Sequence, residues 1–205
     1  MSRDFTESTA PLTGISWKGV PSTPVDERIK EAMAGDRGAI DALIAAHHRA
    51  VYRVCYRMMG NREDVQDIEQ EVFLRMLRHL AKYDPDLPFV PWLYSIAMKV
   101  CRDALRKRKR RRTEPLENVP AEKLAASPDF IGKLDIEDEM SILEAGLETL
   151  PEKERGAIVL RDIEGLSTRD VAAAMGTKEV TVRSQISRAR VKLKAYRDAI
   201  RRDEI

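Results

Sequence analysis

Arginine and lysine are the side chains of this 205-residue chain whose number and spacing indicate chemistry with a partner. Nine of them lie between Lys99 and Arg112 against a single acid, Asp103, and nine more lie between Lys178 and Arg202 against two acids. The net charge of the whole chain is nevertheless only +2. Basic blocks of this kind are typical of proteins that bind a polyanion such as nucleic acid.

An acidic stretch separates the two basic blocks. Glu114 to Glu139 holds eight acids against Lys123 and Lys133. The basic run from Arg106 to Arg112 has no interleaved acid, so a merely solvated helix face explains it poorly. We therefore expect two anion-binding surfaces on separate bodies.

Catalytic and metal-binding groups are not indicated by the other polar residues. The sequence holds no P-loop, nucleophile motif or cluster of metal ligands, so we expect neither an enzyme nor a cofactor. Cys55 and Cys101 are isolated thiols in apolar-periodic stretches, which favours buried, reduced cysteines over a disulfide framework or a zinc site. His47, His48 and His79 also lack a ligand cluster around them.

Hydrophobic patterning places the chain in an aqueous compartment. There is no apolar segment of signal-peptide type near the N-terminus, and the longest apolar stretch, Phe89 to Met98, is too short to span a bilayer. We expect a cytoplasmic protein that does not insert into a membrane.

Helices must position the basic blocks, because no stretch alternates with period two. In the first half, apolar residues recur every three to four positions on two helices separated by Gly60-Asn61: Leu43, His47, Val51, Val54 and Met58, then Val65, Ile68, Val72, Met76 and Leu80. The segment from Tyr83 to Pro91 contains three prolines and predicts a non-helical loop. Trp92 is then expected to open a helix that runs into the first basic block.

The same patterning predicts an all-α fold of two small helical domains joined by a flexible linker. Residues 1–24 read as a flexible tail rich in Ser, Thr, Pro and Gly, although Trp17 is unusual in such a segment. The first domain is expected at 25–112, the acidic linker at 113–136 and the second domain at 137–205.

The second domain carries the sharpest motif, a helix-turn-helix between Gly165 and Lys194. Ser167 is placed to cap a first helix, with Asp170 three residues later. Gly176 supplies the turn, and Thr177 is expected to cap a second, basic helix. An ordinary helical hairpin is the alternative.

The outward face of the second helix favours the DNA-binding interpretation. Its core stripe is Val182, Ile186, Ala189 and Leu193. The opposite face carries groups that read base edges or hold phosphates in a major groove. The candidate DNA contacts on this face are Thr181, Arg183, Ser184, Ser187 and Arg188, with Val180 beside them.

These residues carry a family resemblance. The matching residues are Leu150-Pro151, Arg155, Glu164-Gly165-Leu166-Ser167, Val171-Ala172, Met175-Gly176, Thr181-Val182-Arg183-Ser184 and Arg188-Ala189-Arg190. This run resembles the C-terminal helix-turn-helix domain of extracytoplasmic-function (ECF) sigma factors. The resemblance implies that this domain binds the upstream (−35) promoter box. Gln185 departs from the family pattern, which has a basic residue there.

The first domain resembles the same family through a different set of residues. Asp64, Asp67, Gln70, Glu71 and Phe73 match the helix that such factors dock on the clamp helices of the polymerase β′ subunit. The resemblance implies a polymerase-binding set of Asp64, Asp67, Gln70, Glu71 and Arg75. Acids that surround an apolar stripe are also suited to a basic partner surface.

A further segment resembles the family's promoter-opening element. The matching residues are Phe89, Trp92-Leu93, Ile96-Ala97, Asp103 and Arg106. Met98 and Lys99 depart from the family pattern. The resemblance implies that the loop before Trp92 captures a flipped base of the downstream (−10) box while the basic helix holds the strand. The residues assigned to this site are Phe89, as core support for the loop, and Lys99, Arg102, Arg106, Arg110 and Arg111.

The resemblance implies a non-enzymatic initiation factor whose partners are core RNA polymerase (β′ clamp helices and β flap), promoter DNA and an anti-sigma factor. Two boxes one and a half turns apart lie about 50 Å from each other, which a drawn-out linker can span. A dimeric repressor is one alternative, but it leaves the acidic helix and the Trp92 segment unexplained. An enzyme acting on nucleic acid is another, and it requires a carboxylate or metal cluster.

Overall fold

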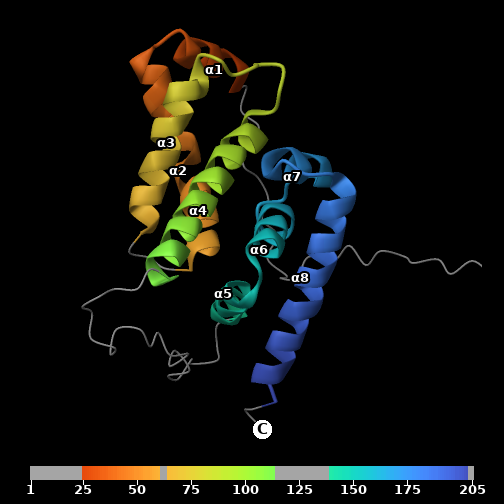
Figure 1. Ribbon diagram of the computed structural model, residues 1–205. Coiled ribbons are helices and arrows are strands. Elements are labelled where there is room, and N and C mark those ends of the chain that lie inside the picture. The colour runs from red at the N-terminus through yellow and green to blue at the C-terminus, as the bar shows by residue number, and fades with distance from the viewer. Residues whose placement is uncertain (1–24, 61–63, 114–138, 203–205) are drawn as a thin grey trace, which may run out of the picture.

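The computed structural model describes residues 25–60, 64–113 and 139–202, and throughout these ranges the regular structure is helical (Figure 1). The all-α expectation is confirmed. The expected tail, with Trp17, and nearly all of the expected linker lie outside the described residues, as does Asn61. None of the described helices combines the length and apolar character that crossing a membrane requires.

The N-terminal domain consists of α1 (Val25–Met33), α2 (Arg37–Met59), α3 (Val65–Leu80) and α4 (Phe89–Thr113). The expected apolar stripes of α2 and α3 are buried. The expected break at Gly60 is confirmed: this residue adopts the left-handed conformation (φ 65°), and its N–H donates to Tyr56 O.

The expected start of α4 at Trp92 is wrong. The helix begins at Phe89, so Pro91 lies in its first turn. A proline is tolerated there because the first N–H groups of a helix have no partner within the helix. The loop is therefore shorter than the proline spacing indicated, and it ends at Pro88.

The C-terminal domain consists of α5 (Glu139–Thr149), α6 (Glu152–Ile158), a π-helical turn η2 (Val159–Ile163), α7 (Thr168–Met175) and α8 (Glu179–Ile200). The helices α7 and α8 form the expected helix-turn-helix. The π-helical turn continues directly from α6, and a turn of this kind is often found at functional sites.

The caps of the helix-turn-helix were predicted in part. The Ser167 side chain accepts a hydrogen bond from Asp170 N (3.1 Å), and Gly176 ends α7 with φ 62°, both as expected. The expected cap at Thr177 is wrong, because Lys178 is the N-cap residue of α8 and provides no side-chain hydrogen bond. The start of α8 is thus held by packing, with Val182 fully buried.

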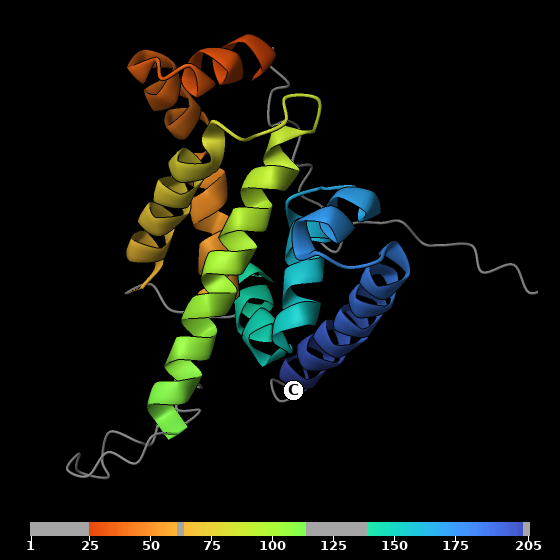
Figure 2. The ribbon, with the colours of Figure 1, turned by 45° about the horizontal axis from the view of Figure 1, so that its top comes forward.

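The two domains pack against each other instead of standing apart. Buried side chains of both form one continuous apolar core. The helix α4 packs against α2 and α3 on one side and against α7 on the other, while η2 and α6 contact α2 (Figures 1 and 2). Gly156 lies close to α4, because a Cβ at that position would lie 2.5 Å from Met98 Cε and would displace the end of that side chain.

Candidate nucleic-acid interface

The helix α8 presents one face to solvent and buries the other. Val182, Ile186 and Ala189 are at most 6% exposed, and Leu193 continues this stripe. The five residues expected to contact the upstream box all lie on the exposed face: Thr181, Arg183, Ser184, Ser187 and Arg188. The sequence therefore predicted correctly which side of the helix faces solvent.

Acidic neighbours hold the cations of this face in place. Arg183 pairs with Glu179 (3.1 Å) one turn earlier, and Arg188 pairs with Glu154 (3.3 Å) of α6. The Arg183 and Arg188 side chains nevertheless remain 62% and 58% exposed. The Arg183–Glu179 pair is exposed on both sides and contributes little energy, so a phosphate or a base can replace that carboxylate. Glu154 is buried, but it also pairs with Lys192 (2.8 Å) and so keeps a partner when Arg188 turns to DNA.

Gln185, the residue that departs from the family pattern, lies on the opposite side of α8. It is only 5% exposed, and its Oε1 atom has no hydrogen-bond partner among the described residues. The side chain therefore faces the interior of the helix-turn-helix rather than a DNA groove. The position does not belong to the candidate DNA contacts.

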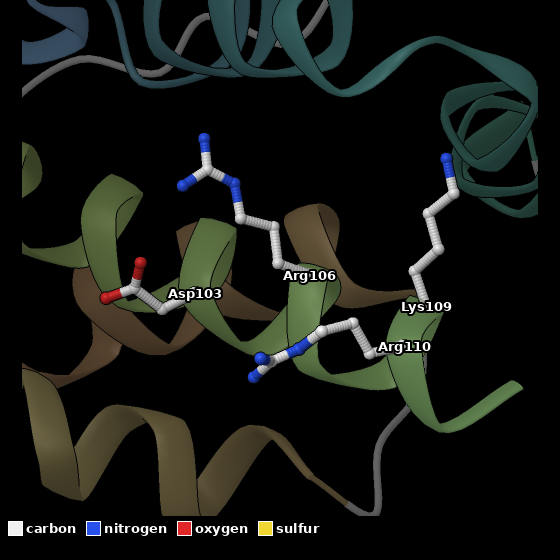
Figure 3. Close-up of a pocket in the computed structure, with 4 residues that line it drawn as sticks. All are labelled: Asp103, Arg106, Lys109 and Arg110. Carbon is white, nitrogen blue, oxygen red and sulfur yellow. The ribbon is translucent and has the colours of Figure 1, made fainter. Parts of the chain in front are cut away.

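The basic part of α4 forms the second candidate surface. Lys99, Arg106, Arg110 and Arg111 are exposed, as their assignment to the downstream box requires. A hollow of about 630 Å³ lies along this helix and is lined by Asp103, Arg106, Lys109 and Arg110 (Figure 3). Three cations around one acid give the hollow a positive character that suits a phosphate backbone.

Arg102 of this set is already engaged. Its Nε donates to Glu152 Oε1 of α6 at 3.1 Å, and the Arg102 side chain is 30% exposed. An acid of the C-terminal domain therefore occupies the position at which a DNA phosphate was expected.

Aromatic rings support the loop before α4. Phe89 is buried, and its ring lies 5.4 Å from Trp92, as the supporting role expected of it requires. Tyr83 and His47 complete the cluster, with ring distances of 5.5 Å and 5.3 Å to Phe89. The Tyr83 hydroxyl also donates across the loop to Leu87 O. The sequence pattern gave no indication of a role for Tyr83 apart from its position next to the loop prolines.

The outer face of α3 carries the candidate polymerase contacts. Asp64, Asp67 and Gln70 are exposed, and Glu71 is half-buried. Arg75 is tied to its neighbours, because it donates to Glu71 (2.6 Å) and to Asp103 (3.1 Å) of α4. The bond to Glu71, more than that to Asp103, raises the pKa of Arg75.

Two exposed leucines of α3 were missed by the sequence analysis. Leu74 and Leu77 are 42% and 36% exposed and follow the acids on the same helix. Their spacing of three residues places them next to each other on the helix surface. An apolar patch with acids beside it is typical of a protein-binding site.

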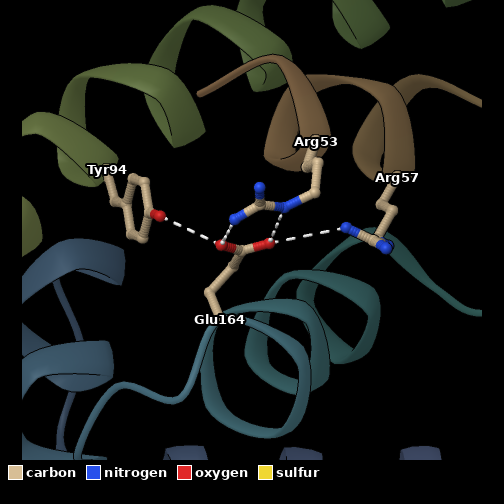
Figure 4. Close-up of polar contacts among 4 residues, drawn as sticks. All are labelled: Arg53, Arg57, Tyr94 and Glu164. Atoms are coloured by element: carbon tan, nitrogen blue, oxygen red, sulfur yellow. Dashed lines mark hydrogen bonds and ion pairs between the residues drawn. The ribbon is translucent and has the colours of Figure 1, made fainter. Parts of the chain in front are cut away.

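A buried polar cluster lies where the domains meet, centred on Glu164, whose side chain is 3% exposed (Figure 4). Its carboxylate accepts from Arg53 Nη2 (2.9 Å), Arg57 Nη1 (3.4 Å) and Tyr94 Oη (3.1 Å). Burial and then the Glu164 charge raise the pKa of Tyr94. The hydrogen bond to Glu164 raises the pKa of Arg53, whereas burial lowers that of Arg57. No local pattern could predict these contacts, because the partners lie 70 to 111 positions apart.

Comparison with known proteins bears on what these surfaces bind. Residues 43–111 match the family model of sigma-70 region 2, and residues 140–193 match that of sigma-70 region 4. The ECF RNA polymerase sigma factor SigE of Mycolicibacterium smegmatis is 37% identical over 90% of this chain and 72% of its own length. The ECF RNA polymerase sigma factor SigW of Bacillus subtilis is 29% identical over 83% of this chain and 95% of its own.

Solved structures show a similar fold. CnrH in complex with the cytosolic domain of CnrY matches with a TM-score of 0.65 and 29% identity, covering 86% of this chain and 99% of CnrH. The sigma factor RpoE of Bartonella quintana in complex with the anti-sigma factor NepR has a TM-score of 0.62 at 23% identity, covering 77% of this chain and 96% of that one. The second likeness shows the fold alone.

Proposed function

Since this chain belongs to the ECF RNA polymerase sigma factors, non-enzymatic proteins that bind core polymerase and direct it to promoters, we propose the following division of that work among its residues. The outer face of α8 reads the upstream box, the basic face of α4 holds the strand of the downstream box, and the outer face of α3 docks on the polymerase. We further propose that the chain works in the cytoplasm.

The observation that carries this proposal is the division of α8 into two faces. Its apolar stripe is buried in the helix-turn-helix, whereas the opposite face exposes two arginines, two serines and a threonine. Arginine forms bidentate hydrogen bonds with guanine in a major groove, and serine or threonine bonds to several bases. Thr181, Arg183, Ser184, Ser187 and Arg188 are the proposed upstream-box contacts.

The basic face of α4 suits backbone contact rather than base reading. The cations Arg106, Arg110 and Arg111 lie along one exposed helix beside the hollow that Asp103 also lines. Several cations in a row neutralise successive phosphates without distinguishing the bases. Lys99 and Arg102 extend the same row towards the loop at Tyr83 to Pro88, the proposed place of base capture.

The outer face of α3 suits a docking helix. Leu74 and Leu77 provide the apolar centre, and Asp64, Asp67 and Gln70 provide a polar rim. Such a surface fits the β′ clamp helices of the polymerase, with apolar contacts for affinity and acids for orientation. We assign contact with the β flap to the C-terminal domain, and an anti-sigma factor is a further proposed partner.

The test is to separate the surfaces with purified core polymerase. Asp67→Asn combined with Leu74→Ala should abolish co-elution with the polymerase, whereas Ser184→Ala combined with Arg188→Ala should leave it intact. The second pair should instead lose the upstream box in a footprint of the promoter complex. Asp41→Asn, an exposed acid on α2, is the matched control. Normal co-elution of the α3 variant would contradict the assignment of that helix.

A further inference from the structure

The contact between the domains joins groups that are expensive to bury. Glu164 of the C-terminal domain is almost completely enclosed, and the guanidinium of Arg57, which faces it, has a side-chain exposure of 7%. A buried carboxylate is tolerated only when cations and hydrogen-bond donors surround it, and Arg53, Arg57 and Tyr94 all come from the N-terminal domain. Glu164 therefore depends on the neighbouring domain for all of its side-chain partners that the structure describes.

Other polar contacts cross the same boundary. Tyr56 donates to Glu144 (3.1 Å), Arg102 pairs with Glu152 (3.1 Å), and Arg155 donates to Met58 O (2.8 Å). Apart from Arg155, these contacts join an acid of the C-terminal domain to a donor of the N-terminal domain. The boundary is thus complementary in charge as well as apolar in its core, as in a specific interface.

The closed arrangement is too compact for a two-part promoter. The helix α7 packs against both α4 and α8. Packed helices lie about 8–10 Å apart, so two successive contacts keep the part of α8 that touches α7 within about 20 Å of the part of α4 that touches α7. Figures 1 and 2 show that this part is the first half of α4, next to the loop. Boxes one and a half turns apart require about 50 Å.

We propose that Glu164 is the centre of an intramolecular latch that holds this protein in a closed form unable to engage both promoter boxes. Opening exchanges the Glu152 carboxylate on Arg102 for a phosphate of the downstream strand. This inference rests on the proposed division of promoter binding between α4 and α8. It concerns the protein's own domains and requires no inhibitor.

Glu164→Gln tests the latch with little change in shape. An amide removes the negative charge, so Arg53 and Arg57 lose the carboxylate that they share. Asp162→Asn is the matched control: Asp162 is also enclosed and accepts two bonds from Arg190 (both 2.9 Å), but that partner lies in its own domain. The pair of variants separates opening of the boundary from loss of a buried carboxylate.

Closure is measured directly in the free, full-length chain. Cysteines introduced at exposed Gln66 and Lys194 take a fluorophore pair selectively, because Cys55 and Cys101 are buried. The unaltered chain and Asp162→Asn should give high energy transfer, and Glu164→Gln should shift most molecules to low transfer. Arg53→Gln with Arg57→Gln should do the same from the other domain, and the triple variant should add nothing further.

Promoter complexes are measured with the same proteins without labels. Glu164→Gln should reach half-maximal open-complex formation at a several-fold lower concentration than the unaltered chain. Equal energy transfer in all variants would overturn the latch, and so would an opened variant whose open-complex formation is unchanged. If Glu164→Gln unfolds, the Arg53/Arg57 variant carries the same test. A failure of the proposed function would look different. In that case, variants of the α8 contacts would leave promoter choice unchanged, and their energy transfer would stay high.

Discussion

Arginines at the domain boundary and arginines on the outer faces have the same side chain but different roles. Arg57 and Arg155 lie at the boundary, where carbonyl and carboxylate oxygens of the other domain accept their bonds. Arg183 and Arg188 are more than half exposed and pair with acids of their own domain. Burial fixes the bonds of the first pair, whereas exposure leaves the second pair available for exchange. Stability should therefore depend on the boundary, and promoter choice on the outer faces.

Replacing Arg155 by methionine should give the largest effect and would sharpen this comparison. The Arg155 side chain donates to Met58 O (2.8 Å), Glu148 O (2.6 Å) and Leu150 O (3.2 Å). The bonds to Met58 O and Leu150 O are partly buried, whereas the bond to Glu148 O is exposed. A buried carbonyl left without a donor costs about 1–3 kcal/mol, so we expect the free energy of unfolding to fall by about 2–3 kcal/mol. Urea unfolding measures this change.

The control for this prediction is an exposed arginine of the same domain. Arg197 pairs with Asp198 at 3.2 Å, and both side chains are more than 40% exposed. Arg197→Met should change the free energy of unfolding by less than about 1 kcal/mol. Equal losses in the two variants would remove the distinction between boundary and surface.

The next largest effect is expected on the reading face of α8. Arg188→Ala and Ser184→Ala should each cost about 1–3 kcal/mol on the preferred upstream box and little on other boxes. Glu154 remains paired with Lys192 (2.8 Å) when Arg188 is removed, so the domain should stay folded. Binding of the holoenzyme to promoters that vary only in the upstream box measures the preference. A uniform loss on every box would show that these residues only grip the backbone.

Neutralising Arg110 and Arg111 should have a smaller effect that does not depend on sequence. Each lost phosphate contact lowers the salt slope of binding by about 0.7–0.9. Two lost contacts therefore weaken open-complex formation equally on all promoters, and the loss between 50 and 200 mM salt should be about tenfold smaller for the variant than for the unaltered chain. The matched control is the exposed pair Arg201 and Arg202 at the end of α8. If open-complex formation were weakened on some promoters and not on others, α4 would read bases and not only hold the backbone.

Local pattern predicted the helices and their outward faces because it depends on residues three to four positions apart. Val182, Ile186 and Ala189 are buried as the periodicity required, and Ser167 caps α7. Pro91 was misjudged because proline both breaks helices and suits their first turn.

The boundary between the domains could not be predicted in the same way. Glu164 and Arg155 were part of the family resemblance, yet their partners in the other domain lie 70 to 111 positions away. The number of charges in each segment indicated the basic blocks. It did not distinguish Arg102, which pairs with an acid of the other domain, from Arg106. Which cations are occupied depends on how the domains pack, and local spacing does not contain that information.

Tyr83→Phe should give the smallest effect and tests whether the loop before α4 belongs with the rigid boundary or with the outer faces. The ring is buried against Phe89 and Trp92, so phenylalanine keeps the packing and removes the bond from the hydroxyl to Leu87 O. A hydrogen bond to a carbonyl that water can reach contributes about 0.5–1.5 kcal/mol. We expect open complexes to form several-fold more slowly on duplex promoters and normally on promoters whose downstream box is already unpaired. The melting temperature and the upstream-box preference should not change.

Tyr52→Phe, at a half-buried tyrosine of α2, is the control. If the delay were equal on duplex and unpaired templates, the Tyr83 hydroxyl would serve the general fold and not the capture of a base.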